Sequence, residues 1–94
     1  MMKMSVMYPK TEGASFDMEY YKTKHFEIVD RTMKPARWEI DAGVAGPYEV
    51  VAHLYFDSQG AMDAGMAEAA EAGADVPNFT TIKSVVQVAE IVDV

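Results

Sequence analysis

The stretch from Phe16 to Met33, FDMEYYKTKHFEIVDRTM, most constrains the fold, because it predicts one long amphipathic helix. At about 3.6 residues per turn, one face collects most of its uncharged residues: Met18, Tyr21, His25, Ile28, Val29 and Thr32. Asp17 suits the start of the helix as an N-cap, and Pro35 ends it because the residue before a proline avoids helical angles. The fold must therefore bury a helical face that carries a tyrosine and a histidine one turn apart.

The remaining segments predict four strands and a second helix. Apolar and polar residues alternate with a period of two in the predicted strands, which are Lys3–Tyr8, Ala36–Asp41, Tyr48–Phe56 and Ile82–Val92. The second helix is predicted over Ser58–Ala72, with Gly73 suited to its C-terminal cap. The resulting order, β-α-β-β-α-β, is typical of an α+β, ferredoxin-like fold with a four-stranded antiparallel sheet and both helices on one face.

Length and composition narrow the class of protein. The chain has 94 residues and a formal net charge of −7, which indicates one acidic globular domain spanning residues 1–94. Its few basic residues are scattered, so we expect no nucleic-acid partner, and no apolar run is long enough to span a membrane. There is no cysteine, which excludes thiol chemistry and disulfides and fits a cytoplasmic protein.

The face of the sheet that the helices leave uncovered is also predicted to be largely apolar. It would carry Met7, Val51, Tyr55, Val85 and Ile91 beside Glu49, His53 and Gln87. A patch of that breadth is rarely left in contact with water. A second copy packing sheet to sheet with two-fold symmetry would cover it, so the sequence predicts a homodimer formed through this face.

Two histidines are the main candidates for chemistry. His25 is suited to general acid–base work near neutral pH, and Tyr21, one turn earlier, to holding a substrate oxygen. Tyr8 is expected near the same cavity. The alternative is that His25 is a core histidine satisfied by one hydrogen bond. His53 lies on the opposite face of the sheet, at the expected interface, and no spacing in the chain indicates a metal, nucleotide or dinucleotide site.

Four segments, in this order, resemble the EthD (ethyl tert-butyl ether degradation) family of the dimeric α+β barrel superfamily: SVMYP at Ser5–Pro9, FDMEYYKTKH at Phe16–His25, AHLYFDS at Ala52–Ser58 and VPNFTTIKSVVQVAEI at Val76–Ile91. The resemblance implies a ferredoxin-like subunit and a barrel formed by two facing sheets. It also places the family's helix tyrosine and histidine on Tyr21 and His25. Relatives are commonly labelled EthD family reductases, and cousins in the superfamily include cyclases, isomerases and cofactor-free monooxygenases that bind flat, oxygenated rings between helices and sheet.

From the residues and the resemblance together we expect a small hydrophobic ligand and no tightly held cofactor. The expected catalytic residues are His25 and Tyr21, and the expected substrate-binding residues are Tyr8, Val50, Leu54, Met62, Met66 and Phe79. The chain departs from the family where Phe26 and Glu27 follow the histidine and where the loop before the third strand shortens to AGVAGP, both at the pocket mouth. Three functions remain open. The protein is an enzyme, either an oxidoreductase or a cofactor-free isomerase or cyclase; or it is a non-catalytic binding or accessory protein for an oxygenase system; or it is a dimer with a closed pocket.

Overall fold

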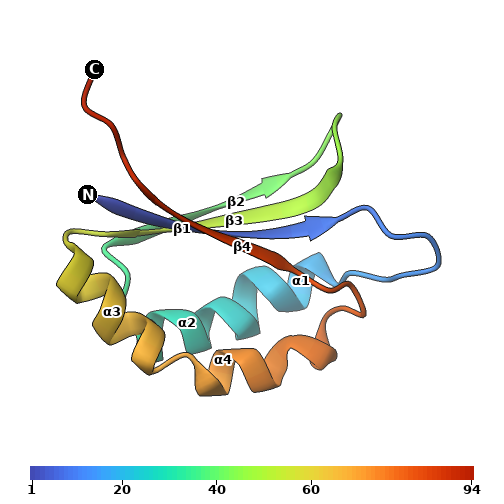
Figure 1. Cartoon of the computed structure of the whole chain (residues 1–94). Coiled ribbons are helices and arrows are strands. Elements are labelled where there is room, and N and C mark those ends of the chain that lie inside the picture. The colour runs from blue at the N-terminus through green and yellow to red at the C-terminus, as the bar shows by residue number, and fades with distance from the viewer.

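The computed structural model describes all residues, Met1–Val94, as an α+β fold of two layers, with the helices beneath one face of a four-stranded sheet (Figure 1). The strands are β1 (Met2–Pro9), β2 (Arg37–Ala42), β3 (Tyr48–Phe56) and β4 (Val85–Glu90). They lie in the order β2-β3-β1-β4, and every pair is antiparallel. The predicted ferredoxin-like fold is confirmed, although β4 is shorter at both ends than the strand predicted over Ile82–Val92.

The long helix consists of three consecutive parts: α1 (Met18–Tyr20), a π-helical segment (Tyr21–His25) and α2 (Phe26–Met33). Asp17 caps its start as predicted, with a side-chain oxygen that accepts the backbone N–H of Tyr20 at 3.0 Å. Lys34, in the left-handed conformation at φ 53°, ends it before Pro35. The π-helical segment is not visible in the apolar periodicity of the sequence, and it contains both residues predicted to act in catalysis.

The second helical region is divided into α3 (Gln59–Ala67) and α4 (Ala70–Asp75), where one helix was predicted over Ser58–Ala72. The prediction that Gly73 ends the helix is wrong, because α4 continues through it to Asp75 and a 3-10 turn follows over Val76–Asn78. Both parts pack against the core, since Met62 in α3 and Ala72 in α4 are buried members of the same hydrophobic cluster.

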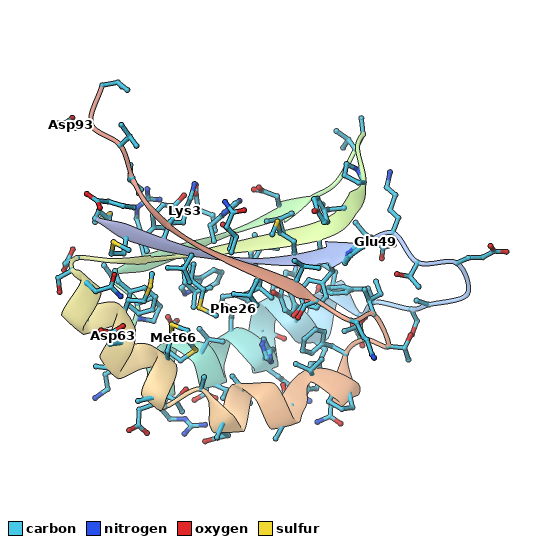
Figure 2. The ribbon with its side chains drawn as sticks, in the orientation of Figure 1. Lys3, Phe26, Glu49, Asp63, Met66 and Asp93 are labelled. Carbon is cyan, nitrogen blue, oxygen red and sulfur yellow. The ribbon has the colours of Figure 1, made fainter.

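The core lies between the two layers. Alternate residues of β3 face the helices, and Val50, Ala52, Leu54 and Phe56 are all buried there. Phe26 lies between the sheet and the helices, as Figure 2 shows. A Cβ added to Gly65 in α3 would come within 2.8 Å of both the Met33 carbonyl oxygen and the Phe56 ring, so this glycine is needed for the close approach of α3 to α2 and β3.

The opposite face of the sheet carries no helix, and Lys3 and Glu49 lie on that side (Figure 2). In this open face, Met7 of β1 pairs with Val51 of β3 and Val85 of β4, which places three apolar side chains in a row. In the next row Ser5 Oγ lies 2.8 Å from His53 Nδ1. His53 Nε2 lies 2.9 Å from Oδ2 of Asp41, which pairs with Val51 at the β2 end of the apolar row. The chain thus folds with one covered and one uncovered sheet face.

Strand β4 forms an edge of the sheet. Its valines are unusually accessible, because Val85, Val86 and Val88 expose 49%, 49% and 44% of their surface. The residues after β4 run away from the helices, on the side of the open face (Figure 1). None of the helices combines the length and apolar character that crossing a membrane demands.

Candidate functional site

A cavity of about 180 Å³ lies between the long helix, α4 and the sheet. It extends across the helix-facing side of the sheet from β1 to Val86 of the edge strand β4. Its lining is mostly apolar and contains no lysine, arginine or carboxylate: Met4, Val6, Tyr8, Tyr21, His25, Phe26, Val29, Met33, Leu54, Ala69, Ala72, Gly73, Val76, Ser84 and Val86. Two wider hollows elsewhere are surface depressions lined largely by polar residues such as Arg31 and Glu68. The first cavity is therefore the candidate site.

The π-helical segment places Tyr21 and His25 against each other at the cavity wall. Their rings are 5.2 Å apart between centroids and 12° from parallel. A π-helical turn contains more residues than an α-helical one, and single π turns are frequent at functional sites. Phe79 supports the pair from behind, with ring centroids 4.6 Å from His25 and 4.7 Å from Tyr21. The Asp17 backbone N–H donates to the Phe79 carbonyl oxygen at 2.8 Å, which ties this support to the start of the helix.

His25 is buried, with 6% of its surface exposed, and it is paired with Asp75, which is 8% exposed. His25 Nδ1 lies 3.0 Å from Asp75 Oδ2. The other carboxylate oxygen of Asp75 accepts two hydrogen bonds, from the Tyr20 hydroxyl at 2.7 Å and from the Asn78 side-chain amide at 2.9 Å. The chain thus brings together a histidine and an aspartate 50 positions apart, and both oxygens of the carboxylate are occupied.

The electrostatics of this pair fix its protonation at neutral pH. Burial lowers the pKa of His25, and this effect outweighs the attraction of Asp75 for the imidazolium. Burial raises the pKa of Asp75, but the hydrogen bonds from Asn78, Tyr20 and His25 outweigh it and hold that pKa below its ordinary value. At pH 7 Asp75 is therefore an anion that only accepts hydrogen bonds. Burial likewise favours the neutral imidazole of His25, whose Nδ1 lies within hydrogen-bond distance of that anion.

The second ring nitrogen of His25, Nε2, is not sealed inside the core. No buried side-chain nitrogen or oxygen of the chain lacks a hydrogen-bond partner. His25 bonds through Nδ1, so Nε2 must reach accessible space, and His25 lines the cavity. Tyr8 and Tyr21 also line it, and burial raises the pKa of both phenols, so both stay protonated hydrogen-bond donors at neutral pH. The site thus combines an imidazole with the hydroxyl groups of Tyr8, Tyr21 and Ser84 inside largely apolar walls.

Comparison with known proteins identifies the family. No protein-family model and no curated protein matches the chain. Among solved structures, an EthD-like protein from Ralstonia eutropha JMP134 is 33% identical, with a TM-score of 0.86 over 98% of this chain and 92% of that chain. The chain belongs to the EthD family. Two further solved structures have the same fold. An EthD family protein from Bacillus halodurans C-125 is 17% identical, with a TM-score of 0.76 over 98% of this chain and 99% of that chain. A protein from Arabidopsis thaliana is 14% identical, with a TM-score of 0.75 over 100% of this chain and 98% of that chain.

The predicted site residues of this EthD-family chain fall into two groups. Tyr8, Tyr21, His25 and Leu54 line the cavity together. The others lie elsewhere: Val50 and Met62 are buried in the core, Met66 is exposed on α3, and Phe79 is buried behind Tyr21 and His25 rather than lying exposed in a loop. His53 lies on the open face, away from the cavity, and no group of three or more His, Asp or Glu side chains converges in a way that could hold a metal ion.

Sequence reasoning missed Asp75, Tyr20 and Asn78 in this EthD-family site. Asp75 lies beyond the end of the helix predicted over Ser58–Ala72, and nothing in its spacing connects it to His25. A weak signal exists in Asp75–Asn78 itself, because aspartate, proline and asparagine are residues typical of turns. The predicted helical face does not include Tyr20, because a regular α-helix would turn Tyr20 away from the face of Tyr21. The π-helical segment and the approach of α4 bring the three residues together.

Proposed function

We propose that this EthD-family protein binds a small, uncharged, oxygenated ring compound in the cavity, and that His25 moves a proton on it. The size of the cavity supports the ligand class, because an engineered apolar cavity of about 150 Å³ holds benzene and this one measures about 180 Å³. The lining offers no cation to a carboxylate or phosphate. A phenol or a cyclic ketone of one ring therefore fits better than an anion.

The observation that carries the proposed reaction is the position of His25, which lines an apolar cavity while its Nδ1 lies 3.0 Å from Asp75 Oδ2, and whose pKa burial lowers. We infer that its Nε2 is unprotonated and faces the cavity. A base with this environment can take the proton next to a carbonyl group. The C–H electrons then form an enolate, whose oxygen accepts a hydrogen bond from the Tyr21 or Tyr8 hydroxyl. The protonated His25 returns its proton to carbon or oxygen, so that the net reaction is an exchange or shift of a proton. No further reactant is needed for this step.

The experiment is proton–deuterium exchange of a panel of cyclic ketones in D₂O, followed by NMR. We expect the protein to accelerate exchange of at least one ketone, and His25→Gln to lower that rate about 10²-fold or more, because general bases contribute about 10²–10⁴-fold. His53→Gln, which changes the other histidine of the chain, is the matched control and keeps the rate. Equal rates for both variants would contradict the assignment of His25 as the base.

A non-catalytic carrier, for example one that serves an oxygenase, is the second candidate. It is favoured by the lining itself, since 12 of the 15 residues that surround the cavity are hydrophobic and can bind a ligand without His25. Under this alternative, a ring compound binds to the wild type and to His25→Gln with similar affinity and no exchange is accelerated. Titration of both proteins with the same panel separates the two functions.

We also propose that the protein acts as a homodimer joined through the open face. The row of Met7, Val51 and Val85 supports this, because no helix of the same chain covers it. The molar mass in solution, from sedimentation or light scattering, tests it. We expect twice the mass of 10.4 kDa for the wild type and a shift toward the monomer for Val51→Glu. Ala74→Glu, an exposed position of α4, is the control and keeps the dimer.

A further inference from the structure

Three side chains contact the carboxylate of Asp75 within hydrogen-bond distance. Oδ1 accepts the Tyr20 hydroxyl and the Asn78 amide, so the carboxylate cannot rotate without losing two hydrogen bonds. Its donors come from the start of the long helix and from the turn after α4. Oδ2 is thereby directed at His25 Nδ1, 3.0 Å away. The four side chains form a continuous chain of contacts, from the exposed Asn78 through the partly buried Tyr20 and the buried Asp75 to His25 at the cavity.

We infer that Asp75 is the positioning residue of the site, which keeps the proton of His25 on Nδ1 and so directs the lone pair of Nε2 into the cavity. The consequence for catalysis rests on the proposed function, but the position of the proton does not. Asp75 does not line the cavity and touches no substrate. It acts through the imidazole, because an anion fixed by two other donors can only accept at Oδ2. Tyr20 and Asn78 in turn fix which oxygen faces the ring.

Asp75→Asn gives the sharpest test, because it keeps the shape of the side chain. The Tyr20 hydroxyl and the Asn78 amide both donate to Oδ1, so we expect the carbonyl oxygen of the new amide to take the place of Oδ1. Its NH₂ group then takes the place of Oδ2 and donates to His25 Nδ1. The imidazole proton must move to Nε2, which changes the base at the cavity into a hydrogen-bond donor.

Imidazole nitrogen shifts in a long-range ¹H–¹⁵N NMR spectrum at pH 8 report this change without any ligand. We expect wild-type His25 to show a protonated Nδ1 and an unprotonated Nε2, and Asp75→Asn to show the reverse. The signals of His53 serve as an internal reference and stay in place. Asp63→Asn, an exposed aspartate of α3, removes the same charge and leaves the His25 pattern unchanged.

Ketone exchange supplies the second measurement. If His25 is the base, Asp75→Asn lowers the exchange rate about 10²-fold or more while ligand affinity changes little, because the apolar walls are intact. Should Asp75→Asn fail to fold, Asn78→Ala removes one of the two donors that direct Oδ2, and we expect a mixture of both imidazole forms in its spectrum. The inference is overturned if His25 shows only an unprotonated Nε2 in both Asp75→Asn and Asn78→Ala. It is also overturned if His25 of the wild type carries its proton on Nε2. A reversed pattern with no exchange of any ketone by the wild type leaves the inference standing and refutes the proposed function instead.

Discussion

Filling the cavity should stabilise the protein and abolish ligand binding in one step. Ala72, on α4, is buried and lines the cavity, so a larger side chain at this position grows into empty space. Leu→Ala substitutions in protein cores leave voids of the order of 150 Å³, and the cavity measures about 180 Å³. Ala72→Leu therefore has room for its three additional carbon atoms.

The expected gain follows from the buried surface. Each buried CH₂ contributes about 0.8 kcal/mol, so three carbons contribute roughly 2.4 kcal/mol. Ordering the leucine side chain costs about 0.5–1 kcal/mol, which leaves a gain of about 1.5 kcal/mol in the free energy of unfolding. For a domain of this size, 1 kcal/mol shifts the Tm by about 4–8 °C, so Ala72→Leu should raise the Tm by about 6–12 °C.

Urea and thermal unfolding at a fixed protein concentration measure the gain, and titration with the ketone panel measures the loss of binding. Ala74→Leu is the control, because Ala74 is an exposed position of the same helix and leucine is nearly as good a helix former as alanine. A Tm for Ala72→Leu that is no higher than that of Ala74→Leu would refute the reasoning. So would undiminished ligand binding, since it would place the ligand elsewhere.

Three further predictions concern single features of the fold. The lowered pKa of His25 means that the unfolded chain binds more protons below about pH 6.5, so the Tm should fall as the pH drops from 7 to 5. His25→Gln should reduce this slope, and an unchanged slope would assign it to other groups. Gly65→Ala should lower the stability by about 1–3 kcal/mol in urea unfolding, because its Cβ meets the Met33 carbonyl and the Phe56 ring; a neutral result would mean that α3 moves freely. Asp17→Ala should cost about 1 kcal/mol through loss of the helix cap, whereas Asp17→Asn should cost much less.

The order and type of the main elements could be predicted from the sequence, because each has a pattern that depends only on neighbouring residues. The alternation over Tyr48–Phe56 and the apolar stripe of the long helix depend only on neighbours in the chain, and their order determines the sheet topology. The same stripe correctly predicts that Tyr21 and His25 face the core. The carboxylate partner of His25 was not predictable in this way, because Asp75 approaches it only after α4 bends away from α3. The burial of Phe79 was not predictable for the same reason, since it depends on contacts with Tyr21 and His25 of the distant long helix.

The accessible edge strand has a consequence for how the protein behaves at high concentration. The segment Val85–Ile91, VVQVAEI, combines strong β propensity with a single charge and no proline, and its outer backbone groups have no partner strand. Such segments are templates for edge-to-edge pairing and for cross-β aggregation. The net charge of −7 opposes this at neutral pH, and that protection disappears near the isoelectric point of about 4.6. Acidification toward this point should therefore favour fibrils over soluble protein.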